Sequence, residues 1–454
     1  MAEVLAPKGS ISSESLINWT IKKNQGQPEF HQAVSEVFHS IFPFISQNKK
    51  YAKQNLLYAL VEPERVISFR VMWENDRGEI ELNRGYRVQM NSAIGPYKGG
   101  LRFHPSVNVS ILKFLAFEQI FKNSLTSLPL GAGKGGSDFD PKGKSDNEVR
   151  RFCQSYMTEL SRHIGDNVDI PAGDIGVGPR EIGYLFGQYK KLTNQYTGVL
   201  TGKGFGWGGS LIRPEATGYG CIYFLKHMLK DIKQDFESQC VGISGSGNVA
   251  QYAAEKAIEY GAIVQTLSDS KGVIYAKNGL SQEHIEFVKI LKNEKRGRIH
   301  ELADQFDGIE YFEGQKPWRF PIHIALPCAT QNELNLEETK HLVAHGLKIV
   351  AEGANMPTTS EAIAYLEGKN IAYASGKASN AGGVATSGLE MSQNALKINW
   401  SRTEVDHKLQ DIMAKIHAQC KEYGTDKGHI DYAKGANIAG FVRVADAMIA
   451  QGLV

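Results

Sequence analysis

The segment 245–250, Gly-Ser-Gly-Asn-Val-Ala, constrains the fold more than any other part of this sequence. It follows the short apolar run 240–244, and after it Val249, Ala253 and Ala257 recur on one helical face. In such a context the first glycine permits a tight turn, the second lets the backbone approach a pyrophosphate, and the helix N-terminus offers N–H donors. Glycines cluster in many loops, so the flanking strand and helix are what make the motif informative. The segment predicts a strand-turn-helix unit that binds a dinucleotide.

The same half of the chain has further short apolar runs at 262–264, 322–326 and 348–351, separated by helical stretches. This alternation predicts a parallel sheet with helices on both faces, so the fold class is α/β with a doubly wound dinucleotide-binding domain. The stretch 198–209 contains six glycines and is predicted to be a hinge or a domain boundary.

The first half of the chain is predicted to mix helices and strands. Apolar residues at helical spacing after Pro28 predict a helix, and extended runs on both sides of the turn residues 75–78 predict a hairpin. Ser145 and Glu148 have the spacing of a capping box at a helix start.

The acidic residue that normally takes the ribose hydroxyls of NAD lies about 20 positions beyond the fingerprint. Asp269 has that spacing. Its neighbours Ser268, Ser270 and Lys271 could instead hydrogen-bond or neutralise the 2′-phosphate of NADP. The residues alone leave NAD and NADP open.

Lysines next to glycine-lined backbone form the second signal, which we expect to be an exposed site for carboxylates. Lys98 lies in Pro-Tyr-Lys-Gly-Gly and Lys134 in Gly-Ala-Gly-Lys-Gly-Gly, while Gln119 and Lys122 are neighbours on one helical face. A partly shielded lysine near other cations has its ammonium form disfavoured, which suits it to polarise a carbonyl or exchange protons. The alternative is that these are solvated loop charges. Lys134 does not fit a P-loop, because Leu128 occupies the first-glycine position.

Other polar positions give weaker signals. Asp174 follows an apolar run in a glycine-lined loop, which suits either a catalytic carboxylate or a helix cap. The small polar residues 378–388 are predicted to be a loop that lines a cleft or caps a helix. His341 and His345 lack the pattern of a metal motif and are predicted to be surface residues, so no metal site is expected.

Composition excludes several classes of function. The 51 basic and 49 acidic residues give a net charge of +2, which provides no field for a nucleic-acid partner. Five widely spaced cysteines suit a reducing compartment, and no apolar segment has the length of a membrane span. We therefore expect a soluble, cytoplasmic protein.

Taken together, these motifs resemble glutamate dehydrogenase, from about residue 30 to the C-terminus. The resemblance is carried by six segments, which are PYKGGLRF, FEQIFKNSL, LPLGAGKGGSDFDP, PAGDIGVG, RPEATGYG and NAGGVATSGLEMSQN. It looks closest to the hexameric, NADP-preferring branch of the Glu/Leu/Phe/Val dehydrogenase family. This resemblance implies the reversible conversion of L-glutamate, water and NADP⁺ to 2-oxoglutarate, ammonium and NADPH.

The resemblance implies a role for each matching residue. Lys134 would activate water and stabilise the carbinolamine oxygen, and Asp174 would move protons to and from the amino group. Substrate-binding residues would be Lys122, Gln119 and Gly173 at the α-carboxylate, Lys98 and Ser387 at the side-chain carboxylate, and Asn380. Cofactor-binding residues would be Thr217, Gly245, Ser246, Gly247, Asn248, Val249, Asp269, Ser270, Lys271 and Asn355.

The resemblance also implies the domain organisation. Residues 1–200 would form a substrate-binding and oligomerisation domain, with 426–454 packing back on it, and residues 201–425 would form the dinucleotide-binding domain of a homohexamer. Three alternatives stay open, namely an NAD-specific glutamate dehydrogenase, a related dehydrogenase for apolar amino acids, and a nucleotide-binding protein without turnover. An apolar substrate would leave a buried ammonium at Lys98 unpaired.

Overall fold

A computed structural model describes residues 12–453 of the chain, which form two compact units. Unit 1 contains the described residues up to Arg213 together with Thr386–Val405 and the segment from Asn437 onward. Unit 2 contains Pro214–Ala385 and Asp406–Ala436. The glycine-rich stretch 198–209 therefore lies wholly within unit 1, and the change of unit comes after Arg213 rather than after residue 200.

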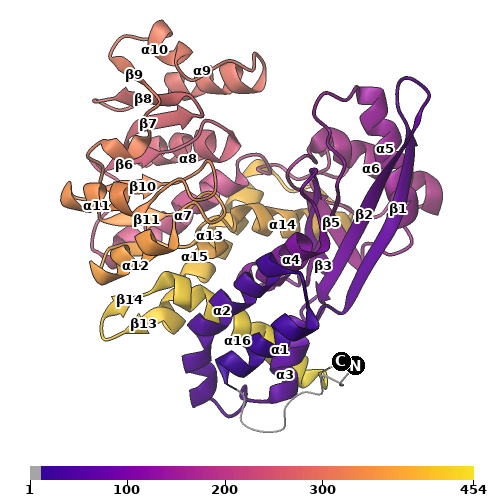
Figure 1. Cartoon of the computed structure of the whole chain (residues 1–454). Helices are drawn as coiled ribbons and strands as arrows, with labels where there is room; N and C mark the ends of the chain where they lie inside the picture. The colour runs from indigo at the N-terminus through magenta and orange to yellow at the C-terminus, as the bar shows by residue number, and fades with distance from the viewer. Residues whose placement is uncertain (1–11, 454) are drawn as a thin grey trace. The chain divides into compact units, whose positions relative to one another are not determined.

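Unit 1 is built on a five-stranded mixed sheet of order β1-β2-β4-β3-β5 (Figure 1). Its strands are β1 (Arg65–Glu74), β2 (Ile80–Asn91), β3 (Tyr97–Phe103), β4 (Ala132–Ser137) and β5 (Asp169–Gly173). Its helices before the unit boundary are α1 (Ser13–Lys23), α2 (Pro28–Gln47), α3 (Gln54–Val61), α4 (Val109–Leu125), α5 (Asp146–Leu160), α6 (Pro179–Thr193) and the short 3₁₀ helix η1 (Phe205–Trp207). The predicted helix after Pro28, the hairpin β1–β2 and the capping box of Ser145 and Glu148 are confirmed.

Aromatic side chains form much of the unit 1 core. Phe139 and Phe152 stack with ring centroids 3.8 Å apart, and Phe103 meets Phe152 edge to face. A fully buried ion pair between Arg87 of β2 and Asp169 of β5 crosses the sheet. Because both charged groups are withdrawn from water, each depends on the other for its solvation.

Unit 2 is built on a seven-stranded sheet of order β12-β11-β10-β6-β7-β8-β9. Its strands are β6 (Cys240–Ile243), β7 (Ile263–Asp269), β8 (Gly272–Ala276), β9 (Ile309–Glu313), β10 (Ile324–Leu326), β11 (Ile349–Ala351) and β12 (Ala372–Ala374). Its helices are α7 (Ala216–Asp231), α8 (Asn248–Glu259), α9 (Gln282–Asn293), α10 (Glu301–Gln305), α11 (Leu336–Ala344), α12 (Ser360–Gly368), α13 (Gly376–Ser379) and the 3₁₀ turn η2 (Pro317–Arg319).

The predicted parallel sheet is confirmed for β12, β11, β10, β6 and β7, and it is incomplete at one edge. There β8 and β9 add two antiparallel strands. The physical reason is the connection between β7 and β8, where only Ser270 and Lys271 separate the strands, and so short a turn cannot make a parallel crossover.

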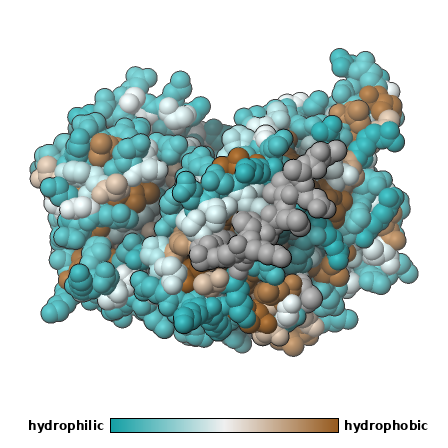
Figure 2. Space-filling model, turned by 60° about the horizontal axis from the view of Figure 1, so that its bottom comes forward, coloured by the Kyte–Doolittle hydropathy of each residue, from teal (hydrophilic) through white to brown (hydrophobic). Residues whose placement is uncertain are grey.

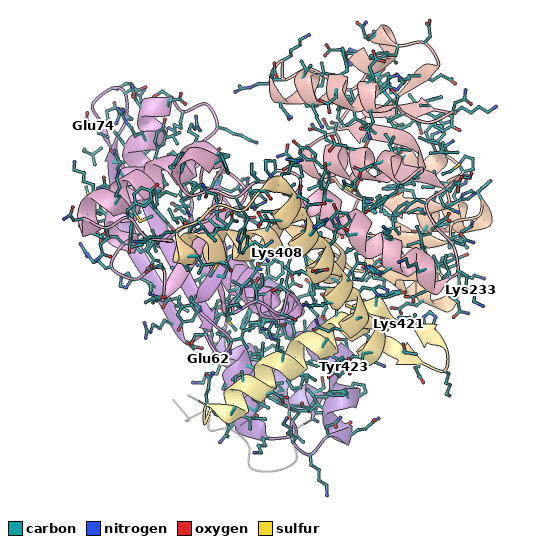
Figure 3. All side chains as sticks on the ribbon, turned by 180° about the vertical axis from the view of Figure 1, so that it is seen from behind. Glu62, Glu74, Lys233, Lys408, Lys421 and Tyr423 are labelled. Atoms are coloured by element: carbon teal, nitrogen blue, oxygen red, sulfur yellow. The ribbon has the colours of Figure 1, made fainter. Side chains whose placement is uncertain are left out.

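Three late helices contain residues of both units, namely α14 (Gly382–Leu396), α15 (Arg402–Gly424) and α16 (Tyr432–Ala450). Figure 3 labels Lys408 and Lys421 on α15. The small hairpin β13–β14 (Thr425–Asp426 and His429–Ile430) connects α15 to α16. Within unit 1, the guanidinium of Arg443 on α16 donates to the carbonyl oxygens of Ser124 and Leu128.

Most of the face shown in Figure 2 is hydrophilic, with small hydrophobic patches between. One face of the hairpin β1–β2 exposes Met72, Ile80 and Leu82 by 49%, 62% and 65%. Glu74 marks the end of β1 at the tip of this hairpin (Figure 3). Among residues 12–453, the structure has no helix that combines the length and the apolar character needed to cross a membrane.

Candidate active site

In unit 1, three adjacent strands carry Lys98, Lys134 and Asp174. Lys98 lies on β3, Lys134 lies on β4, and Asp174 directly follows β5, which are neighbours in the sheet and run parallel to one another. In the register of β3 and β5, Leu101 is opposite Gly173, so Arg102 and Asp174 come next to each other. The sheet therefore places a group of cations around one carboxylate.

Asp174 is the centre of this group. Its Oδ2 lies 3.4 Å from Nζ of Lys134 and accepts a hydrogen bond of 2.8 Å from Nε of Arg102. Burial acts to raise the pKa of Asp174, but the charges of Lys134 and Arg102 outweigh it and hold the pKa below its usual value. Burial lowers the pKa of Lys134, an effect that the Asp174 charge opposes. An ionised carboxylate thus faces an amine that gives up its proton more easily than a free lysine.

The expectation that Lys98 and Lys134 lie in exposed backbone is wrong. Both segments are buried strands, and the two side chains are only 1% and 7% exposed. Glycine supplies the physical reason, because a Cβ on Gly99 would lie 1.7 Å from the carbonyl oxygen of Gly133. The glycines here permit close approach of β3 and β4 rather than a flexible loop.

Lys98 is held by one neutral partner from a distant part of the chain. Its Nζ donates a 2.8 Å hydrogen bond to Oγ1 of Thr201, which is itself fully buried. Burial places the pKa of Lys98 well below its usual value. The site therefore contains a desolvated ammonium that an incoming carboxylate would stabilise.

Helix α4 adds Gln119 and Lys122 to the site. Nε2 of Gln119 donates to Oδ1 of Asn123, and Nδ2 of Asn123 donates to the carbonyl oxygen of Lys98, so α4 is tied to β3. Burial, together with the charge of Lys134, lowers the pKa of Lys122 to about 8. Lys122 and Lys134 thus form a cationic pair on neighbouring elements.

Ser387 lies inside helix α14, so the prediction of a loop over 378–388 is wrong. A Cβ on Gly388 would lie 2.5 Å from Cδ1 of Leu128, so glycine lets α14 pack closely on the segment that follows α4. Ser387 is 3% exposed. At Gly173, a Cβ would lie 2.4 Å from the carbonyl oxygen of Val177, so glycine allows the chain to fold back after β5.

In unit 2, the fingerprint forms the predicted turn between β6 and α8. Gly245 has φ +83°, and its N–H donates to Oγ of Ser268. Gly247 caps α8, is exposed, and a Cβ there would meet nothing within 4 Å. Asn248 is exposed beside it, whereas Ser246 is buried. The N-terminus of α8 is open to a phosphate group, so these residues fit a dinucleotide.

The topology supports the same location. β6 lies between β7 and β10, which is the point where the order of parallel strands reverses. Oγ of Ser244 accepts from the N–H of Cys328, which joins the ends of β6 and β10. Ligands of doubly wound sheets bind at such switch points, beyond the carboxyl ends of the strands.

The carboxylate of Asp269 has hydrogen-bond donors and cations of unit 2 around it. Oδ1 accepts from the N–H of Lys271 and Oδ2 from the N–H of Ile299, while Nζ of Lys292 and Nη1 of Arg298 lie 4.0 and 3.8 Å from Oδ2. Nη1 of Arg298 also donates to Oγ of Ser270. The exposed Ser270 and Lys271 thus have added cations beside them, which favours an anion over a ribose hydroxyl.

Of the remaining predicted residues of unit 2, Asn355 and Asn380 contact each other. Nδ2 of Asn380 donates to Oδ1 of Asn355 at 3.1 Å and to the carbonyl oxygen of Ala354 at 3.0 Å. Thr217, on the first turn of α7, is partly buried next to Gly218, where α7 packs on α8. Val249 lies in the first turn of α8.

Sequence reasoning missed the partners Arg102, Thr201, Lys292 and Arg298. Arg102 stands inside a quoted motif, and its place opposite Asp174 depends on strand register. The other three lie far along the chain from the residues they contact, so no local pattern indicates them. Across residues 12–453 no group of three or more His, Cys, Asp and Glu is arranged to hold a metal ion, and His341 and His345 are exposed.

Comparisons with known proteins cover both units of the chain. The family model "Glu/Leu/Phe/Val dehydrogenase, dimerisation domain" matches residues 63–191, and "Glutamate/Leucine/Phenylalanine/Valine dehydrogenase" matches residues 208–452. A Haemophilus influenzae protein named NADP-specific glutamate dehydrogenase is 58% identical over 444 residues, which are 97% of this chain and 99% of the relative.

Two further relatives cover most of the chain. A Xylanibacter ruminicola protein named NAD(P)-specific glutamate dehydrogenase is 59% identical over 432 residues, which are 95% of this chain and 97% of the relative. The crystal structure of Plasmodium falciparum glutamate dehydrogenase has a TM-score of 0.95 and 52% identity, and the match covers 97% of this chain and 94% of that one.

Proposed function

Because the chain belongs to the Glutamate/Leucine/Phenylalanine/Valine dehydrogenase family, we propose that it is an NADP-dependent glutamate dehydrogenase. The reaction is the reversible oxidative deamination of L-glutamate. L-glutamate, water and NADP⁺ give 2-oxoglutarate, ammonium, NADPH and one proton.

The observation that carries this proposal is the buried ammonium of Lys98, which is 1% exposed and donates to the neutral Thr201. An apolar amino-acid side chain at this position would leave the ammonium without a counter-charge, which is costly in a desolvated site. The side-chain carboxylate of glutamate supplies that charge. Ser387 adds a hydroxyl donor to the same carboxylate.

The α-carboxylate binds Lys122 and Gln119 of α4, with the backbone of Gly173. Holding both ends of the substrate on separate lysines fixes its Cα relative to Lys134 and Asp174, and such orientation provides much of the rate enhancement in reactions of this kind. The lysines of unit 1 therefore both select the substrate and position it.

Asp174 accepts a proton from the substrate ammonium group, because its lowered pKa keeps it ionised. The turn 245–249 of unit 2 would hold the dinucleotide, whose nicotinamide would supply the acceptor for the hydride of Cα. Lys134, whose pKa is lowered by burial, then activates the water that attacks the imino carbon and stabilises the carbinolamine oxygen. Asp174 returns the proton to the leaving amine.

The dinucleotide binds at the turn 245–249, with the pyrophosphate at the N-terminus of α8, and Thr217 and Asn355 complete the cofactor site. Asn380 serves the substrate. The surroundings of Asp269 support NADP, since its side chain is only 7% exposed and the cations Lys292 and Arg298 lie beside it. Ser270, Lys271 and Arg298 would hold the 2′-phosphate.

The proposal is tested by absorbance at 340 nm with 2-oxoglutarate, ammonium and either NADPH or NADH. We expect oxidation of NADPH that requires both other substrates. Preference for NADH would overturn the cofactor assignment, whereas the substrate assignment would stand. Turnover of 2-oxoisocaproate in place of 2-oxoglutarate would indicate a dehydrogenase of apolar amino acids, and no turnover of either would indicate a binding protein.

A separate variant tests the assignment of NADP as the cofactor. Arg298→Ala removes one proposed partner of the 2′-phosphate, so KM for NADPH should rise about tenfold while KM for NADH changes little, given about 1.5–3 kcal/mol for a charged hydrogen bond. Arg319→Ala, on η2, is the matched control. Equal effects on the two cofactors would show that Arg298 does not read the phosphate.

Substrate selection is tested by Lys98→Leu with Ser387→Val, singly and together. Loss of the counter-charge should lower relative kcat/KM for glutamate against norvaline by at least about tenfold from the lysine alone, since charged hydrogen bonds contribute about 1.5–3 kcal/mol. Both substrates are measured at fixed cofactor. An unchanged ratio would return the substrate to the broader amino-acid class.

We propose that the enzyme is a cytoplasmic homohexamer. Five unpaired cysteines suit a reducing compartment. The match of residues 63–191 to a dimerisation domain, together with the exposed apolar side chains on β1 and β2, supports assembly through this part of unit 1.

A further inference from the structure

A second buried charge pair lies behind Lys98 in unit 1. Nζ of Lys203 is 3.0 Å from Oε1 of Glu390, and both side chains are fully buried. Glu390 is on α14, one turn after Ser387, so the two side chains share a helix face. Neither Lys203 nor Glu390 belongs to the residues assigned to substrate or cofactor above.

Glu390 fixes the short turn that carries Thr201. Its carboxylate accepts from the backbone N–H groups of Gly202, at 2.9 Å, and Lys203, at 3.3 Å. The ammonium of Lys203 also donates to the carbonyl oxygen of Leu200. This turn has left-handed backbone at Leu200, φ +64°, and Gly202, φ +86°, so it depends on such partners to keep its conformation.

Thr201 links this turn to the substrate lysine. On one side its N–H donates to the carbonyl oxygen of Pro171 in β5, and on the other its Oγ1 accepts from Nζ of Lys98. Movement of the turn would therefore move the acceptor that aims the Lys98 ammonium. Glu390 therefore acts on the position of Lys98 through the turn and Thr201, and not through a hydrogen bond to Lys98.

Glu390 also sets the local charge. Three cations, Arg87, Lys203 and Arg213, disfavour the charged form of Lys98 and lower its pKa, and Glu390 is the carboxylate that favours it. Arg87 is already paired with Asp169, whereas Lys203 relies on Glu390. Without Glu390, the buried neighbourhood of Lys98 would be cationic before any substrate carboxylate arrives.

We propose that Glu390, paired with Lys203, is a positioning residue that keeps Lys98 protonated and aimed at the side-chain carboxylate of the substrate. This inference rests on the proposed function. It assigns substrate affinity, and its dependence on pH, to a carboxylate that does not contact the substrate.

Glu390→Gln tests the inference, because it keeps the shape and an acceptor while it removes the charge. At a pH above the pKa of Lys98, where each pKa unit lost lowers its charged fraction about tenfold, KM for 2-oxoglutarate should rise about tenfold, while kcat and KM for NADPH change less than about twofold. The fall of kcat/KM with rising pH should begin at a lower pH than in the wild type. A role limited to packing would not move that pH dependence.

Lys203→Gln gives the opposite sign and replaces Glu390→Gln if that variant does not fold. It removes a cation and leaves the carboxylate, so the fall of kcat/KM should shift to higher pH. Glu255→Gln is the control, because Glu255 is also paired with a lysine, Lys289, but lies in unit 2. Its pH dependence should equal that of the wild type.

Experiment can overturn the proposed function and the role of Glu390 independently of each other. Calorimetric titration of the whole chain with glutarate, a five-carbon dicarboxylate, measures the binding site without turnover. A wild type that binds glutarate but does not turn over 2-oxoglutarate would overturn the proposed function, and Glu390→Gln would still have to weaken glutarate about tenfold. Unchanged glutarate affinity and an unchanged pH profile in both variants would overturn the inference.

Discussion

Asp174 and Lys134 form a pair whose two members are shifted in complementary ways. The lowered pKa of the carboxyl group keeps it ionised beside Lys134 and Arg102, and burial favours the neutral form of the amine. A proton acceptor and a group able to lose its proton thus face each other at 3.4 Å. This arrangement suits a reaction in which protons move to and from nitrogen on one side of a carbon atom.

Asp174→Asn should keep the shape of the site and remove its ability to carry a proton. We expect kcat to fall by about 10²–10⁴, the range for acid–base groups, while glutarate affinity changes little. Steady-state assays and calorimetry on the same preparation separate the two effects. A fall of less than about tenfold would mean that another group moves the proton.

Lys122 gives a prediction for pH. Its pKa of about 8 in the free protein means that the ammonium is lost as pH rises through 8, so affinity for the α-carboxylate should decline above that pH. Lys122→Arg keeps the charge through this range, so its kcat/KM should start lower and then decline less between about pH 8 and 9.5. Identical profiles for the wild type and the Lys122→Arg variant would assign the decline to another lysine, such as Lys98.

At the scale of elements, glycines decide how closely the strands and helices of the site approach. The strand β3 passes β4 at a distance that leaves no room for a Cβ on Gly99. In contrast, a methyl group added to Gly187 on α6 would meet nothing within 4 Å, and Gly187 lies in a helix where alanine is favoured. Gly99 and Gly187 are therefore a matched pair of positions for substitution by alanine.

Gly99→Ala should therefore destabilise the protein by more than about 3 kcal/mol, because the backbone of β4 would have to move. Gly187→Ala should stabilise it by about 0.5–1 kcal/mol. Urea unfolding of both variants gives the free energies, and glutarate titration shows whether the lysine site moves. A Gly99→Ala protein with wild-type stability would contradict the strand packing described here.

The elements that could be predicted are those with a local signal. The helix from Pro28, the hairpin and the fingerprint turn all depend on residues a few positions apart. The prediction of exposed loops at the lysine segments is wrong because glycine-rich sequence is typical of loops, and only strand pairing shows that it serves close packing. The pairing of β9 with β8 and the contacts of Asp269 with Ile299, Lys292 and Arg298 join segments far apart in the chain, which periodicity does not encode.

At the scale of the whole molecule, the hairpin β1–β2 presents an apolar face to solvent. Met72 and Leu82 are opposite each other in the register, and both are about half exposed or more. A pair of exposed apolar side chains on neighbouring strands is the type of surface that subunits cover. Figure 1 shows the hairpin as the long ribbons of unit 1, beside α5 and α6.

Leu82→Lys should shift the protein from its largest assembly to smaller species, because a subunit interface would have to bury the ammonium. Sedimentation velocity at several concentrations measures this shift. Ile290→Lys is the control, since Ile290 is an exposed apolar residue on α9, 44% exposed, and should leave the assembly unchanged. The same sedimentation pattern for both variants and the wild type would exclude this face from the interface.

The contact of Arg443 with Ser124 and Leu128 has a consequence for how the protein is made. Unit 1 is completed by the segment from Asn437 onward, which the ribosome synthesises after every segment of unit 2. Unit 2 lacks that dependence on the final residues, as its last segment ends at Ala436. A nascent chain can thus finish unit 2 while unit 1 still waits for the residues from Asn437 onward.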